Sequence, residues 1–278
     1  MPHISLLLGD VGAALVQFPP VTLHDALRLL AAAVAAFLAG GINSVAGGGT
    51  LVTFPTLVWL GLPSVIANAT NTCAIWPGSL GSLWGFRREL AANDPIMFWL
   101  VIPSMLGGVV GALLLRSTPT HTFDRIIPFL ILFATVLFTL QGPIQRWLGT
   151  PHEDRHRSPR WFVTASLVQI LVGLYGGYFG AGMGIMMLTV LTTLGMTDIL
   201  KMNALTSLYA LVINGTAAVL FAVSHMVQWH FVLVMAIAAI AGGWGAAGVA
   251  RRVGRTWVRR FVIALGYVIT VVLFVRIM

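Results

Sequence analysis

Hydrophobic residues run through this chain in long stretches that contain no charged side chain. These stretches cover residues 29–86, 95–115, 126–145, 161–197, 202–250 and 261–275. A helix needs about 20 apolar residues to cross the hydrocarbon core of a membrane, so each stretch has room for at least part of one crossing. Glycine and proline divide the stretches into ten predicted helical segments, at residues 25–45, 50–61, 64–86, 95–115, 123–141, 160–180, 184–195, 199–222, 230–250 and 257–277.

Two of these segments, 50–61 and 184–195, are too short to cross a membrane upright. Each follows a glycine-rich stretch, so we expect each to form a broken or re-entrant pair with the segment before it. The composition agrees with a membrane location, because 58% of the residues are hydrophobic and 9% are charged. Soluble proteins average about a quarter charged residues. The pattern therefore predicts an all-α integral membrane protein, with the lipid bilayer as its surroundings.

The second half of the chain repeats the first. A shift of 134 positions places Gly48 on Gly182 and Gly61 on Gly195. After one inserted residue the shift becomes 135, and it then places Asn68, Gly107, Arg116 and Arg125 on Asn203, Gly242, Arg251 and Arg260. Transporters of many kinds are built from such repeats. We predict an N-terminal segment at 1–24, one repeat at 25–141, a linker loop at 142–159 and a second repeat at 160–278.

Each predicted repeat holds about five helical segments and crosses the membrane an odd number of times, whether its short pair spans or re-enters. The two halves should therefore have inverted topology. Twelve of the 16 Lys and Arg residues lie in loops that follow odd-numbered segments. By the positive-inside rule those loops, with the 142–159 linker, are cytoplasmic and both termini are periplasmic. The formal charge of +8 is then explained by topology.

Several partners and cofactors are not expected. No stretch outside the segments is long enough to fold as a basic nucleic-acid-binding module. Cys73 is the only cysteine, so it has no partner for an intrachain disulfide. His152 and His156 could hold a metal, but a polar loop is the better interpretation because no further ligands cluster near them in the sequence. We expect no cofactor and no metal, and a homodimer is an open alternative for the assembly.

Polar residues inside the segments gather at corresponding places in the two halves, beside the glycine-rich stretches. Where glycines interrupt a helix, the next helix begins with free N–H groups and a partial positive charge, which can bind an anion without Lys or Arg. Neutral Asn, Thr, Ser and Tyr side chains would complete the coordination. The candidate substrate-binding residues are Asn43, Ser44, Gly47, Gly48, Gly49, Thr50, Asn68, Asn71, Thr72, Tyr175, Tyr178, Gly182, Asn203, Thr206 and Ser207.

Other features have simpler explanations. The pairs Gly107-Gly108 and Gly242-Gly243 are best explained as close helix contacts. A single threonine such as Thr53 or Thr189 more often bonds to its own helix than to a ligand. Most tryptophans, Trp76 among them, lie near predicted segment ends and are interpreted as membrane-interface anchors.

Enzyme functions fit poorly. Lys201, the only lysine, does not lie in a phosphate-binding loop. Residues 77–81 approach a nucleophile elbow, but proline replaces the first glycine and no strand precedes it. An intramembrane hydrolase that uses Ser79 or Ser82 with His225 is the most distant alternative. We therefore expect the chain not to be an enzyme.

Several motifs together resemble one family. They are NSVAGGGTLVTFPTL at 43–57, ANATNT at 67–72, PGSLGSLWGFRREL at 77–90, and the second-half counterparts YGGYFGAGMG at 175–184 and NALTS at 203–207. They are similar to motifs of the TauE/SafE sulfite-exporter family, also called the toluene-sulfonate uptake permeases, and the resemblance covers nearly all of the chain after residue 25. It implies a carrier in the bacterial inner membrane for small anions such as sulfite, sulfonates, sulfoacetate or thiosulfate.

Together these observations predict a secondary transporter of a small anion. The predicted segment interiors contain no acidic residue that would suit cation coupling, and the inside-negative potential drives anions outward, so export is favoured. A passive anion channel and an uptake permease coupled to protons or sodium are the alternatives.

Topology is the first testable prediction. Alkaline phosphatase fused at position 155 should be inactive, because the enzyme needs the oxidising periplasm to form its disulfides. The same reporter fused after residue 278 should be active. An active fusion at position 155 would contradict the predicted orientation.

Overall fold

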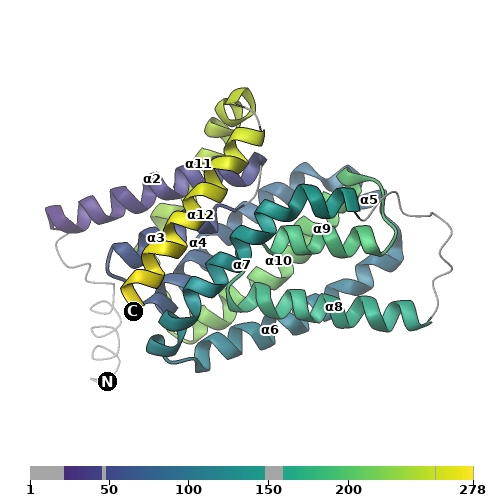
Figure 1. Ribbon diagram of the computed structural model, residues 1–278, viewed down its shortest axis with the longest axis horizontal. Helices are drawn as coiled ribbons and strands as arrows, with labels where there is room; N and C mark the ends of the chain where they lie inside the picture. Colours follow the sequence, from purple (N-terminus) through teal and green to yellow (C-terminus); the bar gives the residue numbers. More distant parts are fainter. Residues whose placement is uncertain (1–21, 46–47, 148–158, 254, 278) are drawn as a thin grey trace, which may run out of the picture.

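The computed structural model describes residues 22–45, 48–147, 159–253 and 255–277. Every regular element in these residues is a helix (Figure 1). The N-terminal half contains α2 (Leu23–Val45), α3 (Thr50–Trp59), α4 (Ser64–Gly85), α5 (Arg87–Ala91), the 3₁₀ helix η1 (Pro95–Leu100), α6 (Val101–Ser117) and α7 (Thr120–Trp147). The C-terminal half contains α8 (Pro159–Tyr178), α9 (Met183–Thr193), α10 (Ile199–Val223), α11 (Trp229–Val253) and α12 (Arg255–Ile277).

All ten predicted segments form helices, and the all-α membrane architecture is confirmed. Six helices in the described residues are long and apolar enough to cross a membrane. Large apolar side chains such as Ile237 and Leu171 are more than 60% exposed, which suits a surface in contact with lipid. The short helices α3 and α9 have 10 and 11 residues, so each covers about half of the hydrocarbon thickness.

Helix α7 extends beyond the predicted segment 123–141 at both ends and continues through Pro143 to Trp147. Proline has no N–H, so Pro143 cannot bond to the carbonyl of Thr139. The Nη2 atom of Arg259 on α12 donates to that carbonyl instead, at 3.2 Å. This bond from the neighbouring helix supplies the hydrogen bond that α7 lacks at the proline.

Two helix pairs pack most closely, α2 with α11 and α6 with α8 (Figure 1). Glycines permit the contact. A Cβ atom on Gly242 would lie 1.9 Å from the carbonyl oxygen of Phe37, and one on Gly107 would lie 2.3 Å from that of Ile170. The interpretation of these glycine pairs as helix contacts is therefore confirmed.

The packing follows the sequence repeat. The shift of 134–135 residues relates α2 to α8 and α11 to α6, so the two closest pairs, α2–α11 and α8–α6, are equivalent to each other. The shift also relates α4 to α10 and α7 to α12, and each of these helices packs against its own counterpart. Two intertwined repeats would give this arrangement. Their opposite orientation in the membrane stays a prediction.

The N-terminal half of helix α4 lies in the interior, with residues 67–74 all buried. Protein on all sides shields its polar residues from lipid, as a polar membrane helix requires.

The interpretation of Trp76 as an interface anchor is wrong. Its Nε1 atom donates to the carbonyl of Leu211 at 3.1 Å, and its ring packs against Gly215, so Trp76 joins α4 to α10.

The glycine contacts lead to a stability prediction. In Gly111→Ala the new Cβ would lie 2.1 Å from the carbonyl oxygen of Leu174, so α6 and α8 must separate, at a cost of about 1–3 kcal/mol. Gly81→Ala is the matched control, because no atom lies within 4 Å of the added carbon. The control should unfold at the same temperature as the parent or slightly higher. Thermal unfolding in detergent measures both, and equal midpoints for the two variants would contradict the close contact.

Candidate functional site

The first glycine junction joins α2 to α3. Gly48 has φ +90°, a conformation that side chains other than glycine rarely adopt. The backbone N–H of Gly49 donates to Oδ1 of Asn43 at 2.7 Å. Asn43 therefore fastens the junction to the end of α2, and only its Nδ2 group remains to donate to a ligand. The side chain of Ser44 and all of Gly47 lie outside the described residues.

The second junction joins α8 to α9, and it contains two residues with positive φ, Gly180 at +78° and Gly182 at +77°. The hydroxyl of Tyr175 donates to the carbonyl of Ala181 at 2.6 Å, which holds the turn in place. Within the described chain, the N–H groups of Gly182 and Gly184 have no hydrogen-bond partner. Helix α9 thus begins with unsatisfied donors and the partial positive charge of a helix N-terminus.

The two junctions meet on α7. A Cβ atom on Gly48 would lie 2.6 Å from the ring of Phe138, and one on Gly182 would lie 3.5 Å from Ala134. Ala134 and Phe138 are four residues apart, or about 6 Å along the helix. The candidate span of α7 is Thr120–Pro143, so Ala134 lies within one turn of its midpoint. The second junction therefore lies near the middle of this span, and the first junction lies about one helical turn further along α7.

Helix α4 holds the second junction from one side. Nδ2 of Asn68 donates to the carbonyl of Tyr178 at 2.9 Å. Oδ1 of Asn68 and Oδ1 of Asn71 are both buried and have no partner among the described residues. Each of these side chains is at most 1% exposed. A buried polar atom without a partner costs free energy, so these two atoms need an explanation.

Helix α10 lines the same junction further along. The hydroxyl of Thr206 is buried without a partner in the described part of the chain, and its methyl group would lie 3.8 Å from a Cβ atom on Gly184. Oδ1 of Asn214 would lie 3.9 Å from a Cβ atom on Gly180. Thr206 is also the repeat counterpart of Asn71, so unpartnered polar atoms occur at equivalent positions of both halves.

The candidate residues do not all meet at one point. Bonds from Trp76 to Leu211 and from Cys73 to Ala218 show that α4 and α10 run antiparallel, so Asn71 lies level with residues beyond 218. Thr206 is twelve residues before Ala218, which is about 18 Å. One small anion cannot contact Asn71 and Thr206 together. The polar groups are instead spread along the second junction, from Asn68 past Asn214 to Thr206.

Some candidate residues have structural partners. The hydroxyl of Thr72 donates to the carbonyl of Asn68, and the hydroxyl of Tyr178 lies 3.5 Å from that of Thr118. The remaining candidates are Thr50, buried at the start of α3, and Asn203 and Ser207, half-buried on α10. The expectation that Thr53 and Thr189 bond within their own helices is confirmed.

Apolar parts of the site were not predicted. The rings of Phe54 on α3 and Phe179 in the second junction lie 5.3 Å apart, edge to face, which brings the two halves into contact beside the glycines. Ala134 and Phe138 of α7 contact the junctions directly. No sequence signal separates these residues from the many other apolar residues of the segments.

Comparison with known proteins supports a transport function. A protein family described as "Sulfite exporter TauE/SafE" matches residues 32–273. The chain belongs to the TauE/SafE family. It is 32% identical to a "Probable membrane transporter protein" of Haemophilus influenzae over 84% of this chain and 89% of that protein.

Two further relatives of the TauE/SafE chain carry similar names. A "Probable membrane transporter protein ORF9" of Sinorhizobium is 30% identical over 75% of this chain and 78% of its own length. The YfcA "Probable membrane transporter protein" of Escherichia coli K12 is 28% identical over 74% of this chain and 75% of its own length. No solved structure matches the chain. Together with the six apolar helices, these relatives identify the chain as a multi-pass membrane transporter.

The first junction generates a prediction. In Gly48→Val the side chain would strain the backbone at φ +90° and clash with Phe138, so transport should fall at least tenfold while the protein still inserts. Gly61→Val is the matched control, because Gly61 has φ +91° but its added Cβ would meet only the end of Arg28 at 3.7 Å. Uptake by membrane vesicles and the amount of folded protein are the measurements. Unchanged transport in Gly48→Val would mean that Gly48 serves helix packing and not transport.

Proposed function

We propose that this TauE/SafE protein is a secondary transporter that exports a small sulfur-containing or organic anion, such as sulfite or an organosulfonate, across the bacterial inner membrane. The observation that carries the proposal is the second junction. There the unsatisfied N–H groups of Gly182 and Gly184 lie near the middle of the membrane, beside the unpartnered hydroxyl of Thr206. These groups are neutral donors that point to an oxyanion.

Neutral donors suit transport because an ion must leave its site as well as enter it. A buried Arg or Lys would bind an anion more strongly and slow its release. Small oxyanions present several acceptor atoms, which match a set of N–H and O–H donors. The name of the family supplies the choice of sulfite, and the geometry supports the broader class of small oxyanions.

A carrier fits the structure better than an open channel. Hydrogen bonds join the two halves toward both ends of the molecule. Toward the predicted periplasmic side, the N–H of Gln228 donates to Oγ1 of Thr70 at 3.1 Å. Toward the predicted cytoplasmic side, the hydroxyl of Tyr209 donates to the carbonyl of Met97 at 2.7 Å. Contacts between the halves on both sides suit the occluded state that alternating access passes through, and an open channel has no need of one.

The proposed direction of transport follows from the negative charge of the substrate. An inside-negative potential moves an anion outward with about 2.3 kcal/mol per charge per 100 mV, so export needs no second ion. In the described residues the acidic side chains are Asp25, Glu89, Asp94, Asp124 and Asp198, and all lie at helix ends or in short connections. No carboxylate is placed at the mid-membrane junctions to bind a coupling cation. The proposed orientation, with both termini in the periplasm, rests instead on the positive-inside rule. The names of the relatives, which describe membrane transporters, support the proposal that the protein is not an enzyme.

Flux measurements test the direction. Purified protein in liposomes should move sulfite down an imposed potassium-diffusion potential, with saturation and with stimulation by sulfite on the opposite side. A proton or sodium gradient should not change the rate. Accumulation against the potential only when a cation gradient is present would contradict export, and a rate that never saturates would indicate a channel.

A further inference from the structure

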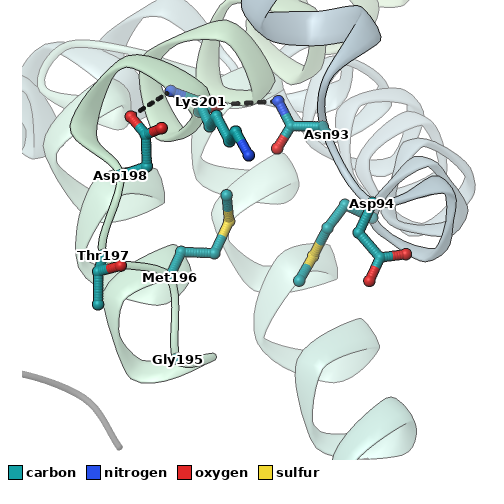
Figure 2. A pocket seen from close by; sticks show the side chains of 8 residues that line it. Asn93, Asp94, Gly195, Met196, Thr197, Asp198 and Lys201 are labelled. Atoms are coloured by element: carbon teal, nitrogen blue, oxygen red, sulfur yellow. Dashed lines mark hydrogen bonds between the residues drawn. The ribbon is translucent and has the colours of Figure 1, made fainter. Parts of the chain in front are cut away.

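A pocket of about 210 Å³ lies away from the junctions, where the connection between α5 and η1 meets the connection between α9 and α10. Figure 2 shows it between these two connections, which come from different halves of the chain. Both connections are predicted to be cytoplasmic. The pocket is lined by Asn93, Asp94, Met97, Gly195, Met196, Thr197, Asp198 and Lys201, and none of these is among the candidate residues predicted from the sequence.

Asn93 gives the pocket a fixed acceptor. Its Nδ2 group donates to the carbonyls of Glu89, at 2.9 Å, and of Lys201, at 3.3 Å, which ties the first half to the start of α10. These two bonds set the orientation of the amide. Its oxygen, Oδ1, then has no partner among the described residues, although the residue is only 7% exposed. A buried acceptor of this kind calls for a donor.

Lys201 gives the pocket a cation. The backbone of Lys201 is held at both ends, because its N–H donates to Asp198 and its carbonyl accepts from Asn93 (Figure 2). Its ammonium group is free to meet a ligand, since no carboxylate of the described residues lies within ion-pair distance of it. The position is unusual for a lysine, because the N-terminus of a helix already carries a partial positive charge.

The two carboxylates that line the pocket are engaged in helix caps. Oδ1 of Asp94 accepts from the N–H of Ile96, and Oδ1 of Asp198 accepts from the N–H groups of Leu200 and Lys201. Together with Oδ1 of Asn93, these carboxylates make the lining of the pocket rich in hydrogen-bond acceptors. A ligand that carries only acceptor atoms would match Lys201 but not the remainder of the lining.

From this pattern we infer that the pocket is an entry site for a small oxyanion that also carries its own hydrogen-bond donor, such as a hydroxyalkanesulfonate. The oxyanion binds the ammonium group of Lys201, and the hydroxyl donates to Oδ1 of Asn93. Lys201 is five residues before Thr206 on α10, or about 7.5 Å along the helix, so the entry site would lie on the predicted cytoplasmic side of the second junction. The inference rests on the proposed function, and it narrows the substrate class.

Two ligands that differ only in the hydroxyl test the inference. Purified full-length protein in detergent is titrated with 2-hydroxyethanesulfonate and with ethanesulfonate in a calorimeter. The hydroxylated ligand should bind about tenfold more tightly, because ethanesulfonate leaves the Asn93 oxygen without a donor. Lys201→Gln should weaken the binding of both ligands about tenfold and keep the preference for the hydroxylated one. Arg88→Gln removes an exposed charge from the same predicted cytoplasmic face, so it is the matched control and should leave both affinities unchanged.

In Asn93→Ala the two ligands should bind equally. If that variant does not fold, the wild-type ligand pair and Lys201→Gln decide the question. Equal binding of the two ligands to the wild type, or full binding by Lys201→Gln, overturns the entry site. Sulfite flux in liposomes separates the two claims. If sulfite flux is present but the two sulfonates bind equally, only the entry site is overturned. If sulfite flux and binding of both sulfonates are absent, the transport function is overturned as well.

Discussion

The need to enclose two interrupted helices inside a membrane governs this structure. Hydrocarbon offers no hydrogen bonds, so a backbone that leaves helical geometry there must be covered by protein. Part of the cover is local, since Asn43 accepts from Gly49 and Tyr175 donates to Ala181. The larger part comes from α4, α7 and α10, which surround the junctions. Helices α7 and α10 also expose large apolar side chains such as Phe129 and Val219, which suits contact with lipid on their outer faces.

Glycine serves opposite purposes in different parts of the chain. At Gly48, Gly180 and Gly182 it permits positive φ and breaks a helix. At Gly107 and Gly242 it lets two unbroken helices approach so closely that a Cβ atom would overlap a carbonyl. The first use creates unsatisfied donors at mid-membrane, and the second makes the enclosure tight enough to exclude lipid. Transport needs both, because a loosely enclosed break would not persist in hydrocarbon.

The sequence predicted the helices well because apolar length, glycine and proline determine them locally. It also predicted that the polar groups of both halves would lie beside the glycine junctions, as Asn68 and Thr206 do. It did not predict that Asn71 and Thr206 lie at least about 18 Å apart along α10, because the antiparallel register of α4 and α10 depends on contacts such as Trp76 with Leu211. The pocket around Asn93 and Lys201 was also missed, since these residues are 108 positions apart in the chain.

The central claim is that the unpartnered donors at the second junction, which are the N–H groups of Gly182 and Gly184 and the hydroxyl of Thr206, serve the substrate and not the fold. Sulfite flux in liposomes, measured for Thr206→Val beside Thr216→Val, tests it most directly. Thr216 lies on the same helix, but its hydroxyl donates to the carbonyls of Val212 and Ile213. Thr206→Val should keep or raise the thermal stability, because it removes a buried hydroxyl without a partner, and it should lower the flux at least tenfold. Thr216→Val should lower the flux little. Full flux in Thr206→Val would contradict the account.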